Sequence, residues 1–320
     1  MVWNIGALNY RGDFGDAVQF FSDTGAPYNV GSAAQFSENT FYSNQGFSSY
    51  HGLLFTLSKN ASHGLHYDFN YTYSHSIDNT SFFANSEGDT GIGGIGLVCD
   101  YVRPRECRSN SDFDVRHYIS GDATYELPFG KGMMFAYDTP FWVNELIGGW
   151  SVSGITSWHP GFPWTDIANA FVASYSNNAP GMIVGARSAL ATHVDKLQGG
   201  GVNIFANQTN AAAALQGPVG FQIGPRNPLV GPHFFNADMG LAKTFPIAVT
   251  AETLNLKFRA DAFNVFNHPS FDIPSENVYN GLDEQDFTGS SFGQISYTVV
   301  PPGNENNGAR VLELSLRLEF

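Results

Sequence analysis

The segment LHYDFNYTYS, residues 65–74, alternates strictly between two kinds of side chain. Its odd-numbered residues are leucine, tyrosine or phenylalanine, and its even-numbered residues are all polar. Successive side chains of a β-strand point to opposite faces of a sheet, whereas side chains on one face of a helix recur every 3.6 residues. Residues 65–74 are therefore predicted to form a strand with one aromatic face and one polar face.

The same alternation recurs along the chain. Further predicted strands cover residues 53–57, 119–127, 150–158, 235–245, 254–262 and 312–320. Lys243 interrupts the apolar row of residues 235–245. The last two strands carry both signs of charge on their polar faces, which allows weak ion pairs between them. One more strand is expected in residues 1–46, where the pattern is poor, so the sequence predicts about eight strands.

The composition fits β-structure and excludes some classes of partner. Only 14% of the residues are charged, against roughly 25% in a typical soluble domain, while 15% are aromatic and 35 are glycine. The chain has 15 lysines and arginines against 29 acidic residues, so nucleic acid is not expected as a partner. No run of 18 apolar residues predicts a membrane-spanning helix, but a barrel strand spans a membrane with about ten alternating residues.

The predicted connections alternate between short and long. Residues 59–64 and 246–253 are short turns and residues 128–147 form a fairly compact connection, whereas residues 79–116, 159–232 and 267–308 are long loops. Outer-membrane barrels have short periplasmic turns and long extracellular loops. We therefore predict an all-β fold, an antiparallel transmembrane β-barrel in the outer membrane. Residues 47–320 would form the barrel segment, and residues 1–46 a poorly defined leading strand and loop.

Three ordered groups of motifs carry a family resemblance. They are SDFDVRH (111–117) followed by YELPFGKG (125–132), then FRADAFNVFNHP (258–269), and finally FGQI (292–295) with the ending at 314–320. Their order and spacing resemble the C-terminal barrel of Oar-like TonB-dependent receptors over roughly residues 47–320. The resemblance implies a parent with a signal peptide, a carboxypeptidase-like β-domain, a plug and a barrel of about 22 strands. The chain shows no plug and no TonB-contacting segment, so we expect it to be the C-terminal portion.

The resemblance implies ligand uptake and no catalysis. A small-molecule or oligomeric ligand would bind the long loops, and the TonB complex would act through an N-terminal region that this chain lacks. We expect no enzymatic activity and no cofactor. Two other hypotheses stay open, a structural or adhesive barrel without transport and a secreted β-rich carbohydrate-binding domain.

Two groups of residues near the chain end have predicted roles. Phe320 closes an alternating strand and resembles the signal that the barrel-assembly machinery reads by pairing with the last strand; a plain closing strand is the alternative. Asn264, Asn267, His268 and Pro269 are expected to form a corner where a strand meets an outer loop, with a ligand contact as the alternative.

Cysteines and histidines add little else. Cys99 and Cys107 lie close together in a polar loop, and in an oxidising compartment we expect a disulfide, with two reduced thiols as the alternative. His63 and His66 have a spacing seen in metal sites, but on a strand they would point to opposite faces, and zinc needs further ligands. We therefore expect no metal site.

Overall fold

One antiparallel sheet forms most of the molecule. The computed structural model describes residues 46–81, 103–168, 179–196, 201–217, 224–249, 252–274, 284–286, 291–299 and 308–319. The strands follow one another across the sheet in chain order, with the two-residue β3 at the end of β2. They are β1 (Ser48–Ser62), β2 (Leu65–Asp78), β3 (Ser109–Asn110), β4 (His117–Glu126), β5 (Trp150–His159), β13 (Phe234–Val249), β14 (Glu252–Phe263) and β17 (Val311–Glu319). The predicted strand at residues 1–46 lies outside the described residues.

The register places the predicted apolar rows on one common face. Tyr71 lies opposite Ile119, Ile119 lies opposite Trp158, and Trp158 lies opposite Phe235. Phe258 and Leu316 are paired in the same way on the last two strands. Because alternate residues share a face, this register puts the apolar row of every long strand on the same side of the sheet.

Most of the apolar face has no protein layer over it in the described part of the chain. Leu312, Leu314 and Leu316 of β17 are 68–71% exposed, and Leu53 of β1 is 67% exposed. In a soluble sandwich these side chains would pack against a second sheet. A continuous exposed apolar band of this kind is instead typical of a surface that contacts lipid or a partner.

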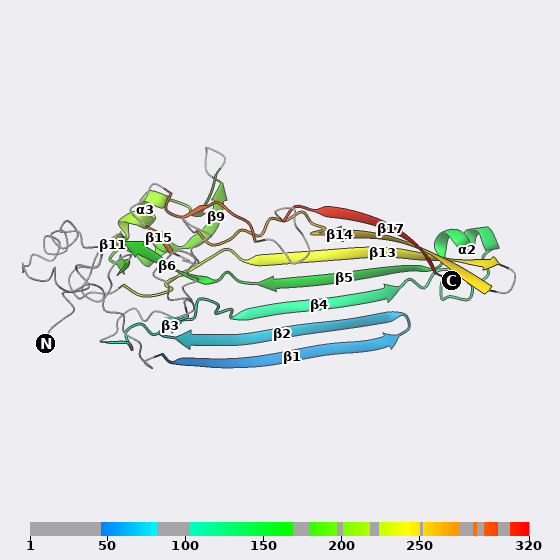
Figure 1. The fold of residues 1–320 in the computed structure, drawn as a ribbon, viewed down its shortest axis with the longest axis horizontal. Helices are drawn as coiled ribbons and strands as arrows, with labels where there is room; N and C mark the ends of the chain where they lie inside the picture. The colour runs from blue at the N-terminus through cyan, green and yellow to red at the C-terminus, as the bar shows by residue number, and fades with distance from the viewer. Residues whose placement is uncertain are drawn as a thin grey trace, which may run out of the picture.

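The two ends of the sheet differ, as Figure 1 shows. At one end, β1 turns into β2 through His63 and Gly64, both with positive φ, and β13 turns into β14 within a few residues. The connection from β4 to β5 at this end is longer than a simple turn, and it contains the helix α2 (Phe141–Ile147). No helix in the described residues is long and apolar enough to cross a membrane.

The other end carries a layer of short elements, which we call the loop layer. The sequence predicts long loops at 159–232 and 267–308, and the described parts of both contain short strands or helices. The elements are β6 (Pro163–Ala168), β7 (Ala179–Pro180), β8 (Met182–Ile183), η3 (Arg187–Leu190), β9 (Thr192–Lys196), β10 (Val202–Phe205), α3 (Gln208–Ala213), β11 (Leu215–Gln216), β12 (Leu229–Val230), β15 (Glu284–Asp286) and β16 (Gln294–Ile295). The buried hydrophobic core lies here and not against the sheet.

The sheet is open in the described residues. β1 pairs with β2 alone, and β17 pairs with β14 alone, so each has one edge without a partner strand. The fold class predicted from the alternation is nevertheless the one observed, an all-β antiparallel sheet with its strands in chain order.

Candidate functional site: the loop layer

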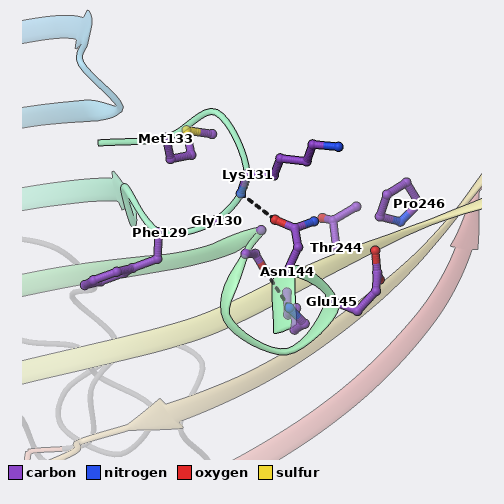
Figure 2. Close-up of a pocket in the computed structure, with 11 residues that line it drawn as sticks. Phe129, Gly130, Lys131, Met133, Asn144, Glu145, Thr244 and Pro246 are labelled. Atoms are coloured by element: carbon purple, nitrogen blue, oxygen red, sulfur yellow. Dashed lines mark hydrogen bonds between the residues drawn. The ribbon is translucent and has the colours of Figure 1, made fainter. Parts of the chain in front are cut away.

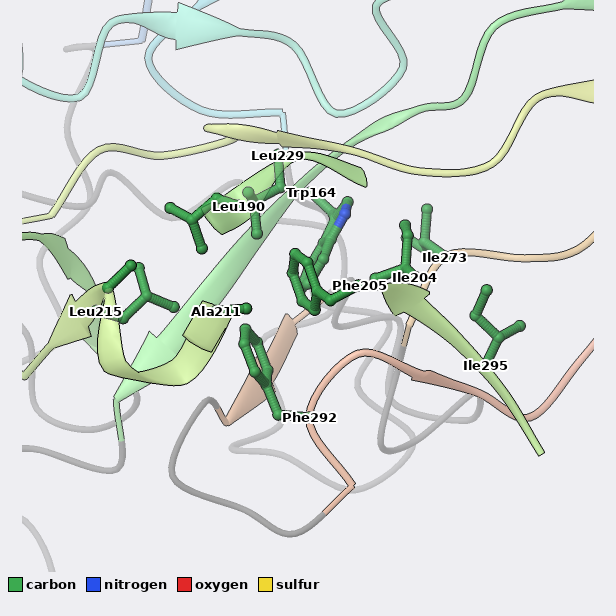
Figure 3. Close-up of a cluster of buried hydrophobic side chains, with 11 residues drawn as sticks. Trp164, Leu190, Ile204, Phe205, Ala211, Leu215, Leu229, Ile273, Phe292 and Ile295 are labelled. Atoms are coloured by element: carbon green, nitrogen blue, oxygen red, sulfur yellow. The ribbon is translucent and has the colours of Figure 1, made fainter. Parts of the chain in front are cut away.

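Three aromatic side chains from distant parts of the chain form the centre of the loop layer (Figure 3). Trp164 of β6, Phe205 of β10 and Phe292 are each at most 1% exposed. The ring centroids of Phe205 and Phe292 are 4.9 Å apart, and each lies 6.2–6.4 Å from that of Trp164. Burial of large aromatic rings stabilises a small unit strongly, so these loops hold a defined shape.

Arg226 attaches the loop layer to the sheet. Its guanidinium pairs with the carboxylate of Asp78, the last residue of β2, and its Nη1 lies 3.3 Å from Asp112 Oδ1. It also donates to Ser81 Oγ at 3.0 Å and to the carbonyl of Asn110 at 3.3 Å. The side chain of Arg226 is 11% exposed and that of Asp78 is 3% exposed. Charge-assisted bonds with so little solvent fix the loop layer against the end of β2.

The next residue, Asn227, extends this attachment to β6. Its side chain donates to Asp112 Oδ1 at 2.6 Å and to the Asn110 carbonyl at 2.9 Å. Thr165 exchanges two hydrogen bonds with Asn227, one with the side-chain oxygen and one with the backbone N–H. Asn227 has a φ of 53°, a conformation that asparagine tolerates better than most residues. Residues 226 and 227 together therefore hold the end of β2, residues 110–112 and the strand β6 in a single arrangement.

Asp166 is an unusual buried carboxylate in the same layer. It is 0% exposed, and neither of its carboxylate oxygens has a hydrogen-bond partner in the described part of the chain. Burial raises the pKa of the Asp166 carboxyl to about 7. A charged carboxylate without partners is costly to bury, so the protonated form fits this position better near neutral pH.

The polar face of the sheet carries a second cluster. His66 Nε2 lies 3.4 Å from Asp68 Oδ2 on its own strand and 3.9 Å from Asp122 Oδ2 on β4. From the sequence, no further metal ligand could be placed near His66, because Asp122 is 56 positions away. The pairing of β2 with β4 brings Asp122 opposite Asp68. The three side chains are 37–50% exposed.

Elsewhere on this face Lys257 and Glu319 form an ion pair of 3.3 Å across β14 and β17, as the predicted charge pattern allowed.

Comparison with known proteins identifies the family. A family model described as an outer membrane beta barrel domain matches residues 8–312. The chain belongs to this family. Searches among curated proteins and among solved structures gave no match.

Membership in the outer membrane beta barrel family assigns the two faces and the two ends of the sheet. The protein is located in the outer membrane. In such a barrel the apolar face contacts lipid and the polar face lines the lumen. Because the short turns of these barrels are periplasmic and the long loops extracellular, the α2 end faces the periplasm and the loop layer faces outward.

The predicted corner residues lie at the outer end of β14. Asn264 is 4% exposed and has a φ of 48°. Its side chain donates to the carbonyls of His268, at 3.0 Å, and Gly308, at 2.6 Å, and accepts from the His268 N–H at 3.0 Å. Asn267 accepts from the Arg310 N–H at 3.0 Å, and Pro269 is exposed. The side chains of Asn264 and Asn267 thus hydrogen-bond to backbone groups of residues 268, 308 and 310, and hold the end of β14 against the residues that precede β17.

The remaining predicted residues are only partly described. Cys107 is 1% exposed and disulfide-bonded. Cys99 and Phe320 lie outside the described residues, so the predicted Cys99–Cys107 pairing and the assembly role of Phe320 stay predictions. Arg226 and Asp166 were missed by sequence analysis, because neither lies in an alternating segment or a recognisable motif.

Proposed function

We propose that this outer membrane barrel is the C-terminal part of a TonB-dependent receptor that takes up a ligand across the outer membrane. The observation that carries the proposal is the loop layer, because a receptor needs an outward surface of fixed shape. Arg226 and the aromatic core give the loops that shape. Loops without a core would lose more conformational entropy on binding a ligand, which would weaken binding.

The ordered motifs support the same proposal. The segments at 111–117, 258–269 and 292–295 resemble the barrel of Oar-like receptors, and they lie where β4 begins, where β14 meets its outer loop, and in the loop layer. In the described residues β1 and β17 each have one edge without a partner strand, which suits a sheet that is one part of a larger barrel. A polar lumenal face suits contact with a plug domain or with water.

In the proposed mechanism, binding and transport are separate steps. The ligand, a small molecule or an oligomer, binds the loop layer, and the TonB complex pulls on a plug supplied by an N-terminal region of the parent. The chain itself is proposed to be non-enzymatic, to use no cofactor and to bind no nucleic acid. Its insertion is proposed to depend on the barrel-assembly machinery, with outer-membrane lipid around the mature sheet.

Uptake by cells that carry the full-length parent tests the proposal. Labelled iron chelates, oligosaccharides and peptides are offered to cells with the intact parent, to cells with a disrupted plug and to cells whose proton-motive force is collapsed. We expect at least one compound to accumulate only with the intact parent and an energised membrane. Equal accumulation of every compound in all three would refute energised transport and favour an adhesive or structural role.

A further inference from the structure

The helix α2 exposes the three largest of its apolar side chains. Phe141, Trp142 and Leu146 are 68–77% exposed, whereas Val143, Asn144, Glu145 and Ile147 are half-buried. A helix that packs on a protein core shows the opposite arrangement, with apolar residues inside. Three large exposed apolar residues on two turns indicate a surface that is covered in the protein's own environment.

Hydrogen bonds place the end of this helix on the lipid-facing side of the sheet. Lys243 and Trp150 lie opposite each other on β13 and β5, within the apolar rows of these strands. Trp150 Nε1 donates to the carbonyl of Leu146 at 3.0 Å, and Lys243 Nζ donates to the carbonyls of Leu146 and Gly148. Because both side chains project from the apolar face, the C-terminal end of α2 lies on the outside of the barrel wall and not in the lumen.

The same contacts explain the interrupted apolar row. Lys243 is 4% exposed, and its ammonium lies 4.7 Å from the Phe245 ring centroid and 5.1 Å from that of Trp150. Carbonyls at a helix C-terminus favour a cation, and aromatic ring faces do as well. The helix therefore covers a charge that would otherwise face lipid.

The connection before the helix, residues 128–140, is hydrogen-bonded to the helix and exposes several large apolar side chains. Figure 2 shows Asn144 directed at the backbone of Lys131, whose N–H donates to Asn144 Oδ1 at 2.6 Å. Gly130, with a φ of 120°, passes so close that a Cβ there would lie 2.7 Å from Asn144 Oδ1. Among the exposed residues of this connection are four large apolar or aromatic ones, Met133, Met134, Phe135 and Tyr137, which are 48–82% exposed. The connection and the helix thus both expose large apolar side chains at the periplasmic rim.

We propose that residues 133–146 form an interfacial anchor, in which Phe141, Trp142 and Leu146 insert into the phospholipid of the periplasmic leaflet. The surface is continuous with the lipid-facing sheet, since Trp150 and Lys243 join the two. Residues 128–149 contain only one lysine and two carboxylates, so few charges would lose water when this segment lies against lipid. Tryptophan at this depth is a known preference of membrane proteins.

Quenching of Trp142 fluorescence by brominated phospholipid tests the anchor. The chain is purified from outer membranes and reconstituted in phosphatidylethanolamine and phosphatidylglycerol vesicles, with bromine placed near the glycerol end of the acyl chains. The difference between the wild-type protein and the Trp142→Phe variant isolates Trp142, and phenylalanine keeps the site apolar. We expect the difference signal to lose roughly half its intensity in brominated vesicles, because an interfacial ring reaches the upper acyl chain.

A matched control reports on an exposed ring away from the membrane. In the Trp142→Phe background, Val184→Trp places an indole on the loop layer, where Val184 is 58% exposed. Its signal should be the same with and without bromine. An unquenched Trp142 signal beside an unquenched Val184→Trp control would overturn the anchor and would point to a periplasmic protein or a second copy as the occupant. Uptake by the parent is not measured here, so this result is independent of the proposed transport.

Discussion

Leu316→Arg should destabilise the protein by placing a charge in lipid. Leu316 lies near the middle of β17, is 68% exposed and faces the same side as its cross-strand partner Phe258. A lipid-facing arginine at mid-bilayer costs about 2–4 kcal/mol. At 1.4 kcal/mol per factor of ten, the ratio of folded to unfolded protein should fall roughly 30-fold to several hundredfold. Urea titration of the protein in lipid vesicles measures this ratio, with heat-modifiable gel migration as the signal of the folded form.

A second arginine on the same strand provides the control. Glu313 lies on the polar face of β17, opposite Asp261. Glu313→Arg replaces a pair of like charges by a pair of opposite charges in a wet lumen, so stability should change by no more than about 1 kcal/mol. Equal urea midpoints for the two variants, or a larger loss in Glu313→Arg, would show that the faces have been assigned the wrong way round.

Three further predictions concern the chain end and the loop layer. Deleting Phe320 should lower the fraction of protein in the heat-modifiable form in outer membranes, because the last strand loses its recognition residue; unchanged assembly would leave Phe320 without this role. Arg226→Met leaves the buried Asp78 carboxylate unpaired, which costs about 3–5 kcal/mol. Hydrogen exchange in residues 202–217 should therefore accelerate strongly while β13 and β14 stay protected, and Arg226→Lys should give a smaller change; equal protection in all three proteins would contradict the attachment. Asp166 has a higher pKa when folded, about 7 against 3.8, so the folded loop layer binds the extra proton in this window and its stability should fall as pH rises from 3.8 to about 7. This rise in the Asp166 pKa corresponds to at most ~4 kcal/mol, and Asp166→Asn should weaken the dependence in urea titrations followed by near-ultraviolet circular dichroism; an unchanged pH slope would exclude Asp166 as a source.

The sheet could be predicted from sequence because its signal is local. Residues 65–74 alternate without a defect, and a period of two determines both the strand and its faces. The pairing order followed from chain order, since antiparallel neighbours in a barrel are joined by turns. Even Lys243 was recognised as an interruption, although its carbonyl partners at the end of α2 could not be seen from the pattern around it.

The loop layer and α2 could not be predicted, for a physical reason. The strands β7, β8, β11, β12 and β16 have two residues each, too few to show any period. Trp164, Phe205 and Phe292 lie 41 to 128 positions apart in the numbering, so only the folded chain shows that they pack together. The partners of Arg226 are likewise more than a hundred positions away. The segment at residues 128–147 was recognised as compact, but α2 has only seven residues, too few to show a helical repeat of apolar positions.

Alternate side chains of the sheet contact lipid while their neighbours contact water, and this arrangement can be measured directly. Spin labels at consecutive positions of residues 66–73 of β2, in the reconstituted protein, test it through collision with oxygen and with a water-soluble nickel chelate. Labels at odd positions should collide mainly with oxygen and labels at even positions mainly with the chelate, with a period of two. Chelate access at every position, in a protein that is a stable monomer without detergent, would contradict it.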